Sequence, residues 1–314
     1  MTVAILLATY NGEKYLCEML QSLEDQTYEN FTVYIHDDGS TDGTISMLQT
    51  WIDEHQADSK KQYVLLEGAK TGSAKANFMW MLSQVESDYY MFADQDDVWL
   101  PNKVDRSVIA LSKLDNEKLY PACIFSDMYV VDKDLNIIDE SFIQYLGRDV
   151  NNVDYTQILI DNPGAGCTYC FDKKLRDMAI TLTDVSSIPM HDHFILALAA
   201  ASGRVQGIDE PLLYYRQTGY NEMGAVTETK LQKVARNLKD LFNGSFKAKK
   251  MAFIAEAKNL AWVILSIDGI NEDVKPVLEE FINIDGKKKS ERRRFYKEHN
   301  FTRAHGNFWM RLWV

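Results

Sequence analysis

The chain has 314 residues, of which 46% are apolar and 25% are charged, with 16 glycines and 6 prolines. This composition excludes a low-complexity or disordered chain, and it can fill one large domain with an appendage, or two domains. The 46 acidic residues outnumber the 34 basic ones, and the net charge of −12 argues against a protein that coats nucleic acid, because phosphate backbones repel such a surface.

The opening sequence MTVAILLATYNG has no basic leader segment, and its apolar run is too short for a signal peptide or a membrane span. We therefore expect a cytoplasmic protein whose 4 cysteines are reduced thiols. Cys167 and Cys170 form a single CxxC, but no second pair of ligands lies near them in sequence to complete a zinc site.

Strand and helix patterns alternate over the first 130 residues. Apolar strands are expected at 3–9, 31–36, 63–67 and 89–93, and after each one apolar residues recur at helical spacing. The last of these helices opens at Pro101. Such a series predicts an α/β fold with a mostly parallel sheet flanked by helices, whose ligands bind beyond the carboxyl ends of the strands.

The pattern becomes mixed after residue 120. Strands are expected at 122–131, 166–171 and 204–208, and a short helix after His191. Beyond residue 226 the apolar spacing is helical throughout. We expect a sheet domain at 1–225, with two halves at 1–118 and 119–225, and a helical C-terminal extension at 226–314.

The C-terminal segment 286–314 differs in charge from the rest of the chain. It contains nine Lys or Arg against two Glu, a local charge of +7, so the remaining 285 residues carry −19. Phenylalanine and tryptophan side chains are interspersed among these charges, and such a mixture is suited to an anionic membrane surface. A solvated helix with a tail that packs on the body or pairs two subunits is the alternative.

The sharpest motif is DQDD at 94–97, directly after an apolar strand. Three carboxylates in four residues repel one another unless water or a cation neutralises them. Mg²⁺ or Mn²⁺ needs only one or two protein carboxylates and completes its shell with water and substrate phosphates. A solvated turn that caps the next helix is the alternative. Polar clusters at the other strand ends favour the metal, with Asp94, Asp96 and Asp97 as candidate ligands.

The loop DDGSTDGT at 37–44 permits two interpretations. A calcium loop beginning at Asp38 fails because its twelfth position is Gln49, which cannot supply a bidentate carboxylate. The favoured interpretation is a base-recognition loop, in which an Asp carboxylate accepts from a pyrimidine ring N–H while Gly39 and Gly43 let the backbone approach closely. A helix cap within this loop stays open.

A third cluster, Met190-His191-Asp192-His193, stands at the head of an apolar helix. Asp192 is a candidate general base for an attacking hydroxyl, a role that depends on hydrogen-bond reach, and a simple helix cap is the alternative. The two histidines could ligate a metal, pair with the carboxylate or pack in the core. We favour packing for His193.

In this order and at these spacings, the clusters resemble the family 2 inverting glycosyltransferases of the nucleotide-diphospho-sugar transferase (GT-A type) fold. The particular sequences resemble the bacterial rhamnosyltransferases of that family still more closely. The resemblance covers about residues 1–226 and rests on ATYNGEKYL, DDGSTDGT, the Asn77-Phe78 segment, ADQDDVWLPNK, GAGCTYCF, MHDHF and IDEPLLYYRQTGYNEMGA. It implies metal-dependent transfer of a sugar, foremost L-rhamnose from dTDP-L-rhamnose, to a hydroxyl of a lipid-linked cell-wall or capsular polysaccharide.

The resemblance also implies roles by position. Asp192 matches the catalytic base. The donor would contact Thr9, Tyr10, Asn11, Glu13, Asp38, Lys75, Asn77, Asp94, Gln95, Arg216 and Gln217. The acceptor would contact Trp99, Gly166, Cys167, Thr168 and His191. The chain departs from the subgroup at Thr218 and Tyr220, where histidine and asparagine are usual, which leaves the contribution of this loop to leaving-group stabilisation open.

The motif chemistry favours transfer over hydrolysis. A glycosidase needs a second carboxylic acid, roughly 5 to 10 Å from the first, to protonate the leaving oxygen, whereas a metal-held diphosphate leaves without one. A UDP-hexose donor for the same reaction and a non-catalytic nucleotide-sugar-binding scaffold are the alternatives. We expect a nucleotide sugar and a lipid-linked glycan as partners, peripheral contact with the inner face of the plasma membrane, no nucleic acid, and a possible homodimer.

Overall fold

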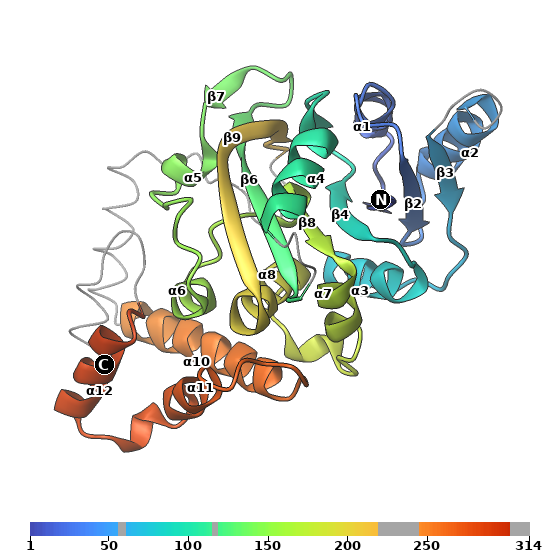
Figure 1. Ribbon diagram of the computed structural model, residues 1–314. Helices are drawn as coiled ribbons and strands as arrows, with labels where there is room; N and C mark the ends of the chain where they lie inside the picture. The colour runs from blue at the N-terminus through green and yellow to red at the C-terminus, as the bar shows by residue number, and fades with distance from the viewer. Residues whose placement is uncertain (56–60, 115–118, 219–244, 302–314) are drawn as a thin grey trace.

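The computed structural model describes residues 1–55, 61–114, 119–218 and 245–301, and these form a nine-stranded sheet with helices on both faces (Figure 1). The strand order is β3-β2-β1-β4-β8-β6-β9-β5, with β7 paired to β6. The strands are β1 Val3–Thr9, β2 Phe31–Asp37, β3 Gln62–Leu65, β4 Tyr89–Asp94, β5 Val98–Trp99, β6 Ala122–Val131, β7 Ile137–Asp139, β8 Tyr169–Asp172 and β9 Arg204–Arg216.

The helices keep the labels of Figure 1. The α-helices are α1 Leu16–Glu24, α2 Thr44–His55, α3 Ala74–Gln84, α4 Lys103–Leu114, α5 Phe142–Tyr145, α6 Tyr155–Ile160, α7 Lys173–Ala179, α8 His191–Ser202, α10 Ser245–Leu265, α11 Lys275–Ile282 and α12 Lys289–Glu298. Three 3₁₀ turns are η1 Gly166–Thr168, η2 Val185–Ser187 and η3 Ile284–Gly286.

The predicted alternation of strand and helix in the first half is confirmed. Strands β1, β2, β3 and β4 pair in parallel, and the register sets Ala8 beside both His36 and Asp94. The polar residues that follow these strands therefore leave the sheet at one edge.

The second half makes the sheet mixed. Strand β8 lies antiparallel between β4 and β6, and β9 runs parallel to β6. The strand expected at 166–171 begins instead as turn η1, and the strand expected at 204–208 continues to Arg216. Pro211 cannot donate a ladder hydrogen bond, and the register shifts beside it, next to Asp127. The helix after His191 has 12 residues.

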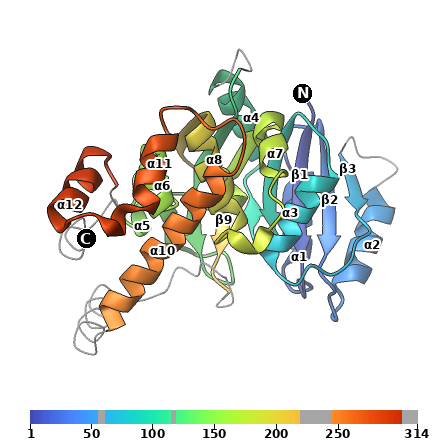
Figure 2. The ribbon, with the colours of Figure 1, turned by 90° about the horizontal axis from the view of Figure 1, so that it is seen from below.

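Side chains of the central strands alternate between two hydrophobic clusters. Ile5 and Leu7 pack with α1, α2 and α4, whereas Ala4 and Leu6 share the cluster that holds α3, α7 and α8. Helices α10 and α11 belong to the second cluster, and Figure 2 shows them beside α6 and α8. The described part of the C-terminal region thus packs on the sheet domain.

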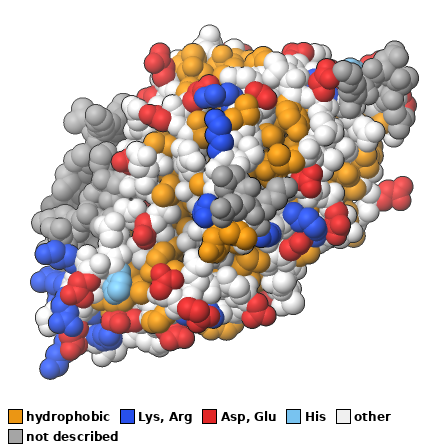
Figure 3. All heavy atoms as spheres, in the orientation of Figure 1, with side chains coloured by type: hydrophobic (Ala, Val, Ile, Leu, Met, Phe, Trp, Pro, Cys, Tyr) orange, Lys and Arg blue, Asp and Glu red, His pale blue; other side chains and the backbone are white. Residues whose placement is uncertain are grey.

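Helix α12 and the residues before it carry many exposed basic side chains. Figure 3 shows Lys and Arg gathered where α12 lies, at the lower left of the molecule, with acidic side chains among them. The first part of the region predicted to be helical beyond residue 226, up to residue 244, and the aromatic tail after 301 lie outside the described residues. None of the described helices is long and apolar enough to cross a membrane.

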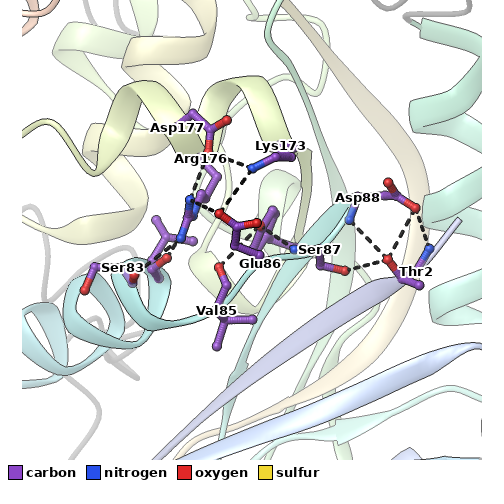
Figure 4. Close-up of polar contacts among 11 residues, drawn as sticks. Thr2, Ser83, Val85, Glu86, Ser87, Asp88, Lys173, Arg176 and Asp177 are labelled. Carbon is purple, nitrogen blue, oxygen red and sulfur yellow. Dashed lines mark hydrogen bonds and ion pairs between the residues drawn. The ribbon is translucent and has the colours of Figure 1, made fainter.

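At the end of the sheet opposite to the polar strand ends, a buried arginine binds the end of helix α3. Arg176 of α7 donates from Nε to the carbonyl of Leu82 (3.0 Å) and from Nη2 to that of Ser83 (3.3 Å), in the last turn of α3 (Figure 4). These carbonyls have no partner within their helix, so the guanidinium caps α3.

Replacing Arg176 by alanine is expected to lower the free energy of unfolding by about 3 kcal/mol, because the buried carbonyl of Leu82 and the more exposed one of Ser83 lose a charged donor. The measurement is urea unfolding of the variant and the parent. Lys173→Ala is the matched control, since Lys173 makes only exposed ion pairs in the same network, worth about 0 to 1 kcal/mol. Equal losses in the two variants would contradict the capping role.

Candidate active site

A cavity of about 500 Å³ opens at the carboxyl ends of β1 and β4. The loop after β2, the start of α3, turn η1, the start of α8 and the end of β9 complete its walls. The structure brings most of the predicted site residues to this cavity: Thr9, Tyr10, Asp38, Asn77, Asp94, Gln95, Asp96, Gly166, His191 and Asp192.

The two carboxylates at the start of the loop after β2, Asp37 and Asp38, have different roles. Asp37 accepts from the N–H groups of Gly39 and Ser40 and so shapes the loop. Asp38 faces the cavity and accepts from the N–H and the hydroxyl (2.8 Å) of Thr71 through Oδ1, and from the N–H of Gly72 (2.9 Å) through Oδ2. Two carboxylate oxygens offer about four lone pairs, so one remains on Oδ2 for a ligand N–H.

Glycine is required at Gly39, whose φ of +85° suits a residue without Cβ. Its Cα also lies close to Lys70, because an added Cβ would come within 3.3 Å of that side chain. Lys70 lines the cavity with its ammonium 5.1 Å from the ring centroid of Tyr10. The sequence analysis missed Lys70, and its place just before an expected helix after the third strand was the available signal.

Asn11, Glu13 and Lys75 brace the rim and do not line the cavity. Asn11 accepts from the N–H of Thr41 (2.8 Å), and Glu13 accepts from the N–H of Gly43 (2.9 Å). These bonds tie the loop after β1 to the loop after β2. Lys75 donates to the carbonyl of Ile188 (2.6 Å). Their direct contact with a donor stays a prediction.

The acidic loop presents two of its carboxyl groups to the cavity. Asp94 and Asp96 line it, whereas Asp97 is fully buried behind them. Burial and the neighbouring Asp96 and Asp94 hold the pKa of Asp97 well above its usual range. Its Oδ2 has no hydrogen-bond partner among the described residues.

The donor atoms in this loop fit a hard divalent cation on the cavity side. One ligand atom each of Asp94, Asp97 and Cys167 lie within 4.8 Å of one another. Burial and the adjacent carboxylates raise the pKa of the Cys167 thiol well above its usual value, so it stays protonated. Carboxylate oxygens are the ligands that Mg²⁺ and Mn²⁺ prefer. Asp94 and Asp96 line the cavity and could hold such a cation there. Ligation by Asp94, Asp96 or Asp97 stays a prediction.

A buried lysine lies beneath the loop. The Lys103 ammonium is 4.5 Å from the ring centroid of Trp99, and burial lowers its pKa to about 8. Its charge acts on Asp97 and offsets part of the excess of carboxylates. The sequence signal was a lysine on the apolar face of a helix. Trp99, expected at the acceptor, is 2% exposed and packs below the cavity.

Arg216 holds the acidic loop from behind. Its Nε donates to the carbonyl of Asp96 (2.8 Å), its Nη1 to that of Lys133 (2.7 Å), and its Nη2 pairs with Glu18. The side chain is buried and does not line the cavity. The structure thus gives Arg216 a bracing position, and its direct contact with the diphosphate stays a prediction.

The neighbouring residues of the last loop are described only in part. The N–H of Gln217 donates to the carbonyl of Val131 (2.9 Å), and its Nε2 has no partner within the described ranges. Gln217 does not line the cavity. Thr218 ends the described segment, and Tyr220 lies outside it.

Asp192 faces the acidic loop across the cavity from the first turn of α8. It is 6% exposed, and burial raises its pKa to about 6, although N–H donors from His193 and Gly166 oppose the shift. A carboxylate with this pKa is ionised at neutral pH and remains basic enough to take a proton. The helix-cap alternative does not hold, since Met190 is the N-cap and Asp192 lies inside the helix.

His191 lies next to Asp192 and stacks on Phe78, with ring centroids 4.3 Å apart. Burial lowers its pKa to about 3, so the ring is neutral. Neither ring nitrogen has a hydrogen-bond partner in the part of the chain that the structure describes, and the residue lines the cavity. Both nitrogens are buried, and the backbone of Gly166 lies close to Nε2. His193 packs away from the cavity and bonds the carbonyl of Ile158 (2.7 Å), as expected.

Turn η1 brings only its glycine to the cavity. A Cβ on Gly166 would come 2.9 Å from Nε2 of His191, so the close approach of the turn to α8 requires glycine. Cys167 and Thr168 are buried, and the Thr168 hydroxyl donates to the carbonyl of Ala165 (2.7 Å). These two side chains support the wall from behind, which differs from the expected contact with the acceptor.

Several known proteins are similar to this chain in sequence. The model of the family "Glycosyl transferase family 2" matches residues 4–160. The dTDP-rhamnosyl transferase RfbG of Shigella flexneri is 28% identical over 229 residues, which cover 70% of this chain and 74% of that protein. The uncharacterized glycosyltransferase alr2836 of Nostoc sp. is 24% identical over 238 residues, covering 74% and 70%.

Two solved structures share the fold at low sequence identity. Staphylococcus aureus TarS 1-349, in complex with UDP-GlcNAc, has a TM-score of 0.57 and 19% identity, covering 98% of this chain and 75% of that one. The mannosyltransferase PcManGT of Pyrobaculum calidifontis, in complex with GDP-Man and Mn²⁺, has a TM-score of 0.53 and 15% identity, covering 90% and 69%. With the family match, these likenesses confirm the GT-A type fold expected from the motifs, and the chain belongs to the family 2 glycosyltransferases.

Proposed function

We propose that this glycosyltransferase transfers L-rhamnose from dTDP-L-rhamnose, with inversion, to a hydroxyl of a lipid-linked bacterial polysaccharide. The observation that carries the proposal is the single cavity that holds Asp38, the acidic pair Asp94 and Asp96, and the buried base Asp192. A base-recognition group, a diphosphate site and a proton acceptor are the parts that transfer from a nucleotide sugar requires.

The proposed step is one displacement at the anomeric carbon. Asp192 accepts the proton of the acceptor hydroxyl while the hydroxyl oxygen bonds to the anomeric carbon and the bond to the diphosphate oxygen breaks. The nucleoside diphosphate leaves with the bonding electrons, on the face opposite the attack, so the configuration inverts. A divalent cation, when bound at Asp94 and Asp96, would stabilise the charge of the departing diphosphate.

The acceptor side of the cavity supports attack by a hydroxyl. His191 is neutral and its buried ring nitrogens have no partner among the described residues, so after a shift of the ring it could accept or donate one hydrogen bond to a sugar hydroxyl beside Asp192. Gly166 lets the turn approach His191 and Asp192 closely, so that its backbone lies beside the same place. Both residues are proposed as acceptor contacts.

The proposed donor is supported by the similarity to RfbG, whose name states a dTDP-rhamnosyl transferase. The two similar structures are in complex with different nucleotide sugars, UDP-GlcNAc and GDP-Man, so the fold alone does not indicate which nucleotide is bound. Asp38 favours a base with a ring N–H, which thymine and uracil share. A UDP-hexose is therefore the second candidate donor.

We also propose peripheral contact with an anionic membrane surface, where a lipid-linked acceptor would be located. The exposed basic side chains before and within α12 support this contact, because each basic residue near anionic lipid contributes about 1 kcal/mol. Membrane contact would place the protein at the inner face of the plasma membrane. The possible homodimer stays a prediction.

A panel of nucleotide sugars separates these candidates. Purified protein, Mn²⁺ and acceptor lipid in vesicles of neutral or anionic composition are incubated with dTDP-rhamnose, UDP-glucose, UDP-galactose or UDP-GlcNAc, and released nucleotide is measured. We expect release of dTDP to exceed release of UDP by at least about tenfold, since a few pocket contacts decide sugar choice. Faster release on anionic vesicles supports the membrane contact. Binding without consumption of any donor would favour the scaffold alternative.

A further inference from the structure

Nearly all of the hydrogen-bonding capacity of Asp192 is used within the protein. Its Oδ2 accepts from Nδ2 of Asn162 (3.3 Å) and from the N–H of Gly166 (3.2 Å), and its Oδ1 accepts from the N–H of His193 (2.6 Å). Because a carboxylate has about four lone pairs in its plane, one remains, on Oδ1. Oδ1 is thus the atom that can take a proton from an acceptor.

Asn162 provides the one side-chain hydrogen bond to Asp192 among the described residues. It follows α6 and is 6% exposed. The hydroxyl of Tyr169 donates to Oδ1 of Asn162 (2.7 Å), and the N–H of Gly164 lies 3.4 Å from the same oxygen. Since both groups are donors, Oδ1 must face them, and Nδ2 is turned toward Asp192.

The charged and titratable groups around Asp192 do not duplicate this bond. Arg148 pairs with Asp161 at 2.8 Å and acts on Asp192 only through its charge. His191 is neutral, and the ring of His193 bonds the carbonyl of Ile158. Burial and the charge of Asp192 raise the pKa of Tyr169 well above its usual value, so Tyr169 remains a hydroxyl donor.

We propose that Asn162, locked by Tyr169, is the positioning residue of the catalytic base. Its amide holds Oδ2 of Asp192 in place and directs the remaining lone pair of Oδ1 into the cavity. The bond also stabilises the ionised carboxylate against the cost of burial, so the base is available at neutral pH. This inference rests on the proposed role of Asp192 and adds two residues, Asn162 and Tyr169, that line no cavity wall.

The test replaces Asn162 by aspartate, which keeps the size of the side chain, and by alanine. In each variant kcat is expected to fall roughly 10-fold to 100-fold, the range for loss of a hydrogen bond to a charged group, while KM for the nucleotide sugar stays within about twofold. The acid limb of the pH profile should move to higher pH, because the ionised form of Asp192 loses a donor. Tyr169→Phe should lower kcat less, by about 3-fold to 10-fold, since the donor remains but is no longer fixed.

Thr156→Val is the matched control, because Thr156 is buried in the adjacent α6 and bonds Asp154 but makes no contact with Asp192. Its kcat and pH profile should match those of the parent. Circular dichroism and nucleotide binding report whether each variant is folded. Parental kcat and pH profile in both Asn162 variants, with Asp192→Asn inactive, would overturn the positioning role alone. An active Asp192→Asn variant would instead remove the proposed base.

Discussion

Replacement of Asp192 by asparagine is expected to lower turnover by at least about 100-fold, the range for loss of acid–base assistance, while nucleotide-sugar binding persists. Asparagine keeps the shape of the side chain but cannot take a proton from the acceptor. The proposed donor contacts at Asp38, Asp94 and Asp96 come from other elements of the chain and should be unaffected. Initial rates at saturating donor, together with calorimetric titration of the nucleotide sugar, measure the two effects.

Asp154→Asn is the control for this substitution, since Asp154 caps α6 and lies outside the cavity. It should retain the parental rate. The parent itself should lose activity below a pH of about 6, the pKa of Asp192, falling tenfold per pH unit as the base becomes protonated. A near-normal rate in Asp192→Asn, or a rate independent of pH between 4 and 7, would remove Asp192 from the role of base.

The raised pKa of Asp192 also affects stability. Its folded-state pKa of about 6 lies above the usual 3.8, so the folded protein binds the proton more tightly than the unfolded chain does. The contribution of this group to folding is therefore fully present below pH 3.8 and is lost as the pH rises through 6. Above that pH, Asp192→Asn should unfold at no lower urea concentration than the parent, which shows that lost activity is not lost structure.

Removal of divalent cations is expected to abolish transfer, and addition of Mg²⁺ or Mn²⁺ to restore it. Asp94 and Asp96 face the cavity, and Lys70 is the one lysine or arginine among the described residues that line it. A diphosphate beside the two carboxylates therefore requires added positive charge. The measurement is the rate of nucleotide release after treatment with EDTA, followed by titration with each metal.

Asp96→Asn should raise the metal concentration needed for half-maximal rate by at least about 100-fold, because a Lewis acid contributes several kcal/mol to such a transition state. Asp42→Asn is the control, since Asp42 caps the start of α2 and does not line the cavity. A full rate in EDTA would reject the metal assignment, and equal metal dependence in both variants would exclude Asp96 as a ligand.

The first half of the fold could be predicted because its information is local. Each apolar strand is followed by a helical pattern, and parallel pairing then brings the residues after the strands to one edge. Asp38, Asp94 and Asp96 reach the cavity for this reason. The position of Asp192 at the cavity was also predictable, since it heads an apolar helix, although its raised pKa follows from burial that sequence does not show.

The second half depends on contacts between distant parts of the chain. Nothing local in four residues of β8 indicates that they pair with β4 and β6 at once. The bracing position of Arg216 could not be predicted for the same reason, because its partners Glu18, Asp96 and Lys133 come from three separate segments. Asn162 gave no signal, since an asparagine after a short helix is typical of an ordinary turn.

The central place of β8 has a consequence for how the chain is made. A ribosome synthesises β4 and β6 before β8, and in the finished sheet β8 is the strand that joins them. Before β8 emerges, β4 lacks its partner on one side and β6 lacks both β8 and β9, which also follows it in the chain. The unpaired backbone groups of such edges attract other chains, and side chains that are fully buried in the mature protein, such as Phe92 and Phe125, belong to these strands. We therefore expect the interval of greatest aggregation risk to last until β9, at residues 204–216, has been synthesised and has paired with β6.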